Sequence, residues 1–198
     1  MMTSLKGQFL IAMPGMMDER FHDAVVYLVA HGEEGAMGIV INQSLPDMHF
    51  TDILEEMDLG RPEDLIQLPS SVQDRAVLSG GPVERGRGFV LHSADYFGED
   101  NTVPVTDDVC LTASIDVLKA ISFGPGPENA LFALGYCGWS PGQLEGELRA
   151  NGWLTAPQSI PLLFKEPIDS RYDAALSTLG RTSGSVNRAS LSSTSGNA

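Results

Sequence analysis

The sequence predicts an α+β fold with a largely antiparallel sheet. Two pairs of apolar runs are each separated by a short glycine-containing link, which is typical of paired antiparallel strands, and single segments of helical period stand between other runs. The sequence shows no regular alternation of strand and helix, the pattern that indicates a parallel sheet. A length of 198 residues fits one domain. We expect residues 1–180 to form that domain, and residues 181–198, rich in serine, threonine and glycine, to form a mobile tail.

The predicted strands are short apolar runs in which β-branched and aromatic side chains are frequent. Residues 24–31 and 36–42 flank a four-residue link with a glycine at each end, so they predict a hairpin. Two further runs flank the glycine-rich segment 79–87, which predicts a second pair of neighbouring strands. In chain order the predicted strands are residues 9–13, 24–31, 36–42, 76–78, 88–92, 109–112 and 129–136.

The predicted helices follow from the spacing of apolar side chains and from capping residues. The first helix is expected to bury three apolar side chains, Met57 among them. Ser140, Pro141 and Gln143 have the pattern of a capping box with proline at the first helical position. The charged segment 61–73 predicts a surface excursion. The predicted helices are residues 51–57, 115–122, 141–150 and 171–179.

The charge of the chain argues against nucleic-acid binding. Twelve lysine and arginine residues against 26 aspartate and glutamate residues give a net charge of −14. A surface with this excess of carboxylates repels polyphosphate, so we do not expect direct contact with DNA or RNA.

The sequence is typical of a cytoplasmic protein. Its two cysteines, Cys110 and Cys137, lack the number and spacing of a disulfide framework, a zinc site or a redox pair. The apolar run near the N-terminus is too short for a signal peptide, and no segment approaches the roughly 20 apolar residues of a membrane span. We therefore expect a soluble, unprocessed protein with no membrane partner.

Several motifs occur in a fixed order along the chain. They are GQFLIAMP at 7–14 with VVYL at 25–28 and VIN at 40–42, GGPV at 80–83 with GFVLHS at 88–93, GYCGW at 135–139 with GQLE at 142–145 and WL at 153–154, and LSS at 191–193. Together they resemble the YqgE/AlgH family of uncharacterised bacterial proteins. The resemblance implies a single α+β domain with a curved, partly barrel-like sheet and flanking helices. It implies no agreed reaction, and a transcription-related role follows from the family name only.

Seven residues are candidates for a ligand-binding site because each stands where a strand or helix ends or where the chain turns. Backbone donors stay unpaired at such places, so polar side chains gathered there can bind a ligand. We predict that the seven converge on one surface depression, and the alternative is that they fix turns and caps at separate places. They are Asn42, Gly80, Gly81, Pro82, His92, Trp139 and Gln143.

The glycine-rich segment 80–88 also contains Arg85 and Arg87, a local basic spot on an acidic chain. Consecutive glycines can form an anion-binding nest. The segment lacks the lysine and the serine or threonine that end a phosphate-binding loop, which favours a tight turn at the end of a hairpin.

No complete catalytic or metal-ligating pattern occurs in the sequence, and none implies a cofactor. The first hypothesis is therefore a non-enzymatic cytosolic protein that binds an unidentified protein or small molecule, with a regulatory role. The alternative is a small hydrolase or transferase with a cleft near His92 and Cys137. In that case the thiol, which precedes a predicted helix, would have its pKa lowered by the helix dipole, and a histidine would take its proton.

Overall fold

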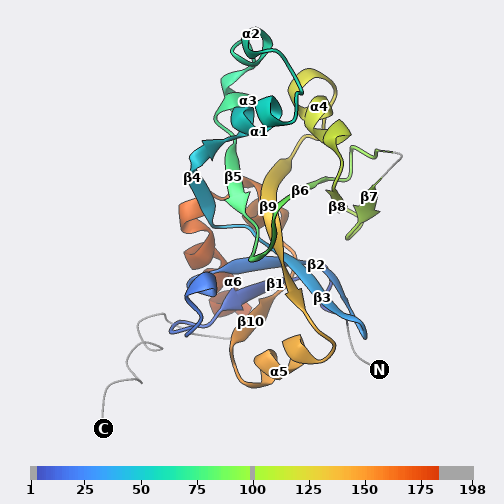
Figure 1. Cartoon of the computed structure of the whole chain (residues 1–198). Coiled ribbons are helices and arrows are strands. Elements are labelled where there is room, and N and C mark those ends of the chain that lie inside the picture. The colour runs from blue at the N-terminus through green and yellow to red at the C-terminus, as the bar shows by residue number, and fades with distance from the viewer. Residues whose placement is uncertain (1–3, 99–100, 183–198) are drawn as a thin grey trace. The chain divides into compact units, whose positions relative to one another are not determined.

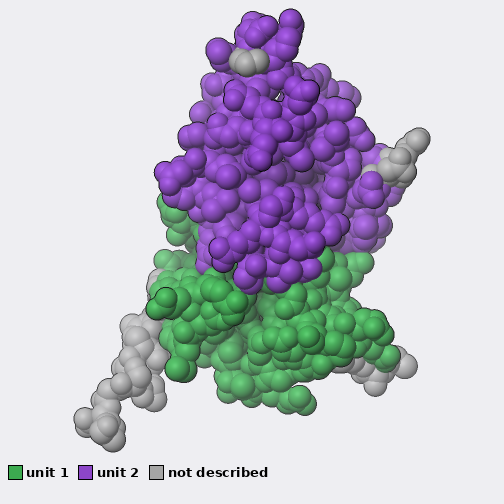
Figure 2. All heavy atoms as spheres, in the orientation of Figure 1, with its two compact units in different colours: residues 1–42, 137–198 green, residues 43–136 purple. Residues whose placement is uncertain are grey.

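The computed structural model describes residues 4–98 and 101–182, and their contacts divide the chain into two compact units. Unit 1 contains Met1–Asn42 and Cys137–Ala198, and unit 2 contains Gln43–Tyr136 (Figure 2). The ten-residue strand β9, Ala130–Trp139, belongs to both. Its first part pairs with strands of unit 2, and its last three residues pair with a strand of unit 1.

Unit 1 is built on an antiparallel sheet with the strand order β10-β1-β2-β3-β9 (Figure 1). All four residues of β1 are buried, so both faces of this strand are covered. The predicted hairpin is present as β2 and β3, because the glycines of its link allow the close turn. The strands are β1 Phe9–Ala12, β2 Val25–Gly32, β3 Gly35–Val40 and β10 Trp153–Ala156. The helices are α5 Gln143–Arg149 and α6 Arg171–Thr182, with the short turns η1 Glu19–Phe21, η2 Pro161–Lys165 and η3 Ile168–Ser170.

Unit 2 is organised around β9, which has a strand on each side. The segment Phe132 to Leu134 pairs in parallel with β5 and antiparallel with β6, and β8 and β7 continue the sheet beyond β6. The strands are β4 Ser44–His49, β5 Ala76–Ser79, β6 Val83–Ser93, β7 Thr102–Pro104 and β8 Val109–Thr112. The helices are α1 Phe50–Glu56, α2 Pro62–Leu65, α3 Ser70–Gln73 and α4 Ile115–Phe123.

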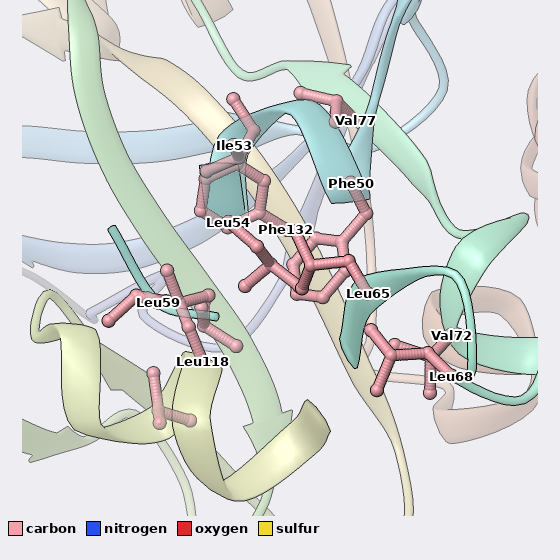
Figure 3. Close-up of a cluster of buried hydrophobic side chains, with 12 residues drawn as sticks. Phe50, Ile53, Leu54, Leu59, Leu65, Leu68, Val72, Val77, Leu118 and Phe132 are labelled. Atoms are coloured by element: carbon pink, nitrogen blue, oxygen red, sulfur yellow. The ribbon is translucent and has the colours of Figure 1, made fainter. Parts of the chain in front are cut away.

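The core of unit 2 forms where α1 and the segment after it pack on β9. Phe50 and Phe132 meet edge to face, with ring centroids 5.7 Å apart. Leu65 and Val72, from the segment predicted to be a surface excursion, are buried in the same cluster (Figure 3). That prediction was wrong because the apolar side chains of this charged segment supply core, whereas its charged side chains lie outside.

The predicted second hairpin was also wrong. Strands β5 and β6 lie on opposite sides of β9, and the connection between them crosses that strand at Gly135. A Cβ on Gly80 would lie 2.3 Å from the Gly135 carbonyl oxygen, and one on Gly135 would lie 2.5 Å from that of Gly81. The glycines are therefore needed where two backbones cross closely. Consecutive glycines such as Gly80-Gly81 are found both at such crossings and in tight turns.

The α+β class with a largely antiparallel, curled sheet and flanking helices is confirmed, with differences at element ends. Helix α5 begins at Gln143 rather than after Ser140, because Gly142 adopts a positive φ of 77° in the turn that precedes it. Met57 follows the end of α1 and is 44% exposed instead of buried. Helix α6 extends past Gly180 to Thr182, and residues 183–198 of the predicted tail lie outside the described residues. That residues 1–180 are a single domain stays a prediction.

Candidate functional site

A pocket with a volume of about 740 Å³ lies within unit 2. Its apolar wall comes from α1, α4, β6 and β9, and Ile53, Leu118 and Phe132 belong both to this wall and to the core cluster behind it (Figure 3). The apolar side chains of Met57 and Ile115 line the pocket with 44% and 42% of their surface exposed. The charged side chains that line it are Glu56, Arg85 and Arg87.

The two arginines reach the pocket because β6 bulges away from β9. Val83 pairs with Tyr136 and Gly88 pairs with Leu134, so four residues of β6 face the single residue Gly135. Such a bulge interrupts the ladder and changes the direction of the side chains on it. The positive φ of 44° at Glu84 marks its start. Residues 84–87 are all exposed, and 85–88 line the pocket.

The two guanidinium groups differ in what holds them. Arg87 donates from Nη1 to the Glu84 Oε2 at 3.3 Å, and its guanidinium lies 5.2 Å from the centre of the Phe89 ring. No described residue forms a hydrogen bond or an ion pair with the Arg85 guanidinium. Of the two arginines that line the pocket, Arg87 therefore has a guanidinium held by its own strand, whereas the exposed Arg85 can bind another molecule.

His92, one of the seven candidates, is buried next to the pocket with no exposed surface. Its Nδ1 lies 2.9 Å from the Ser93 carbonyl oxygen, which can only accept, so Nδ1 carries the proton. Nε2 then accepts from the Thr112 hydroxyl at 2.7 Å, and Thr112 accepts from the Thr102 hydroxyl at 2.8 Å. Burial lowers the pKa of His92, so its ring is neutral near pH 7. Only Thr112 of this chain of hydrogen bonds lines the pocket.

In unit 1, two other candidates meet at a carboxylate that the sequence analysis did not single out. Glu147 Oε2 accepts from Trp139 Nε1 at 2.9 Å and from Trp153 Nε1 at 2.8 Å, and its Oε1 accepts from Gln143 Nε2 at 3.0 Å. Gln143 also uses its Oε1 to accept the Ser140 backbone N–H at 3.0 Å, which is half of the predicted capping box. The four-residue spacing of Gln143 and Glu147 on a predicted helix was the signal that could have revealed this cluster.

The seven candidates divide between the two units. Gly80, Gly81, Pro82 and His92 lie in unit 2, whereas Asn42, Trp139 and Gln143 lie in unit 1. The Asn42 side chain forms hydrogen bonds with the backbone: its Oδ1 accepts from Val25 N at 2.8 Å, and its Nδ2 donates to the Asp23 carbonyl oxygen at 2.7 Å. None of the seven lines the pocket of unit 2. That they share one depression stays a prediction.

The thiol considered as a nucleophile is buried in unit 1. Cys137 is 1% exposed, and burial raises the pKa of its thiol to about 12, so the thiol is protonated at neutral pH. The expected lowering by a helix dipole does not occur because α5 begins six residues later. In the described ranges, no group of three or more histidine, cysteine, aspartate or glutamate side chains is placed to hold a metal ion. None of the described helices has the length and hydrophobicity to cross a membrane.

Comparison with known proteins shows a family to which this chain is similar. Residues 9–183 match the family described as AlgH-like. A UPF0301 protein of Azorhizobium caulinodans is 56% identical over 176 residues, which cover 89% of this chain and 86% of that protein. A UPF0301 protein of Brucella melitensis is 54% identical over 176 residues, with coverage of 89% and 87%.

Two solved structures share the fold. The solution structure of the AlgH protein from Pseudomonas aeruginosa matches with a TM-score of 0.76 and 41% identity, covering 99% of this chain and 97% of that chain. A crystal structure of a protein from Corynebacterium diphtheriae matches with a TM-score of 0.69, covering 97% and 93%. Its sequence is 19% identical, so this second likeness concerns the fold alone.

Proposed function

The chain belongs to the AlgH-like family, and because the names of the relatives above assign no reaction, we propose a function from the site itself: the protein is a cytosolic binding protein whose pocket in unit 2 takes a small organic ligand. The observation that carries this proposal is the pocket. A volume of about 740 Å³ is within the range of small-molecule sites, which combine apolar walls with a few polar groups.

The reactive groups described above favour binding over catalysis. The Cys137 thiol is protonated and buried. Thr112 is 2% exposed, so its hydroxyl is covered in this conformation. A regulatory role would follow if the ligand changed the contact of this protein with a protein partner, which the acidic surface suits better than a nucleic acid.

A second candidate function rests on the contact between His92 and Thr112. A neutral imidazole whose Nε2 lies 2.7 Å from a hydroxyl can take its proton, as required for attack on an acyl carbon. A hydrolase or transferase of this kind would need Thr112 to become accessible from the pocket. Labelling by a fluorophosphonate probe that is lost in Thr112→Val would favour the enzyme, and absence of labelling would favour the binding protein.

The binding proposal is tested with N-phenyl-1-naphthylamine, a neutral apolar dye whose fluorescence rises in an apolar site. The full chain should bind it with a saturable response. Ala113→Phe introduces a ring at a residue that lines the pocket and is exposed, and it should weaken dye binding. Ala150→Phe, on an exposed residue at the end of α5 in unit 1, is the matched control and should bind as the natural chain does. Equal dye binding by all three proteins would contradict the proposal.

A further inference from the structure

Two arginines and one glutamate line the pocket of unit 2, and these charges restrict which ligands the pocket can bind. The net charge of −14 repels anions at a distance, yet two arginines of β6, Arg85 and Arg87, line the pocket. Arg87 already has the Glu84 carboxylate and the Phe89 ring as partners. Arg85 has neither kind of partner among the described residues, so it is the group that can neutralise a charge on a ligand.

Resting on the proposed function, we propose that the ligand is an apolar monocarboxylic acid whose carboxylate pairs with the Arg85 guanidinium. A guanidinium presents parallel N–H donors that match the two oxygens of a carboxylate, which a point charge does not do. One unpaired guanidinium corresponds to one negative charge. Glu56, an exposed carboxylate in the lining, opposes a second negative charge, so phosphate monoesters and polyphosphates fit less well.

The apolar character of the acid follows from the rest of the lining. Ile53, Leu118 and Phe132 form a wall continuous with the core, and none of them offers a hydrogen bond. Met57 and Ile115 extend the apolar surface toward solvent, where an aliphatic or aromatic body would cover them. A polar body such as a sugar would lose hydrogen bonds to water against this wall.

The position of Arg85 on the bulge of β6 leaves its side chain free to turn toward the pocket. The interruption of the ladder leaves the backbone of residues 84–87 outside the pairing of β6 with β9. The Arg85 side chain is exposed and can turn toward the pocket without breaking an existing ion pair. The cost of binding is therefore the loss of side-chain freedom of one arginine, while the partners of Arg87 stay in place.

Isothermal titration of the full chain with four ten-carbon probes tests the inference: decanoate, decanol, decyl phosphate and decylammonium, each below its aggregation concentration. Decanoate should bind roughly tenfold tighter than decanol, as expected for a charge-assisted hydrogen bond. Decyl phosphate should bind no tighter than decanoate, and decylammonium more weakly than decanol. A phosphate that binds tighter than decanoate would overturn the assignment of a single charge, and equal affinities of decanoate and decanol would overturn the role of Arg85.

Three variants separate the guanidinium from general charge. Arg85→Gln should bring the affinity ratio of decanoate to decanol down to about one, and Glu56→Gln should bind decanoate more tightly than the natural chain does. Arg61→Gln changes the net charge equally at an exposed residue paired with Asp64 outside the pocket lining, and it should have no effect. Retention of the preference in Arg85→Gln would overturn the inference. Binding of decanol without a preference for decanoate would leave the proposed function standing, whereas binding of neither would contradict the proposed function as well.

Discussion

The carboxylate of Glu147 offers the most direct test of how unit 1 is held together. Replacing it by alanine in Glu147→Ala removes the acceptor shared by the Trp139 and Trp153 indole N–H groups, whose residues are 6% and 4% exposed. A buried donor left without a partner costs about 1–3 kcal/mol, so two such donors set a range of about 2–6 kcal/mol. Because Glu147 itself is partly exposed and water can enter, we expect the lower half, about 2–4 kcal/mol.

The assay follows from the composition, because Trp139 and Trp153 are the two tryptophans of the chain. Urea unfolding followed by intrinsic fluorescence therefore reports on this cluster, and the midpoint should fall without a change in slope. Glu33→Ala, at an exposed carboxylate in the link between β2 and β3, is the control and should change the free energy of unfolding by less than about 0.5 kcal/mol. Equal midpoints of Glu147→Ala and Glu33→Ala would show that the Glu147 carboxylate does not stabilise unit 1.

Glu147→Gln separates the charge from the acceptor. The amide keeps one oxygen for the indoles but places an NH₂ group opposite the Gln143 NH₂ group, which donates at this place in the natural protein. Gln143 cannot simply rotate its amide, because its oxygen accepts the Ser140 N–H. The loss of stability should be intermediate between those of Glu33→Ala and Glu147→Ala.

Three further outcomes follow from the geometry. Gly135→Ala should destabilise unit 2 by more than about 1 kcal/mol, since the φ of Gly135 is 76° and a Cβ has no room there. Gly146→Ala, on a helix with open space around this residue, should stabilise unit 1 by up to about 1 kcal/mol. Thermal unfolding of both variants measures these changes. Because burial lowers the pKa of His92, the unfolded chain binds more protons just below pH 6.5, so the free energy of unfolding should fall as pH falls below about 6.5. That fall should be reduced in His92→Gln and kept in His22→Gln, and an equal slope in both would contradict it. Because the Cys137 thiol is protonated and buried, it should react with iodoacetamide at pH 8 only as fast as the protein opens, and rapid labelling of the folded chain would be inconsistent with its burial.

The parts of the fold that could be predicted depend on neighbours close in sequence. The β2–β3 hairpin and the start of α4 at Ser114 have local causes, a glycine link and a capping side chain. The pairing of β5 and β6 could not be read in this way, because their common partner β9 comes about 40 to 50 residues later. Strand β4 was not predicted from the sequence. It is largely exposed and contains Pro46, so it lacks the apolar pattern of a strand.

The candidate site could be predicted only in part, because it too depends on residues that are distant in the sequence. Arg85 and Arg87 stand out in the sequence as basic residues among glycines, but their place at a pocket depends on the bulge that pairing with β9 creates. Asn42 and His92 were recognised as polar residues at strand ends. Their polar atoms are used on the backbone and on Thr112, because buried polar groups must find partners within the fold.

Nuclear magnetic resonance of the full ¹⁵N-labelled chain, titrated with decanol and with decanoate, shows whether the pocket of unit 2 is the ligand site. We predict that the backbone amide shifts change along the lining, at residues 53–57, 85–88 and 112–118, with both probes, and that decanoate adds a larger change at Arg85. Changes centred on Trp139, Gln143 and Glu147 in unit 1, or no saturable change with either probe, would contradict a ligand site in unit 2.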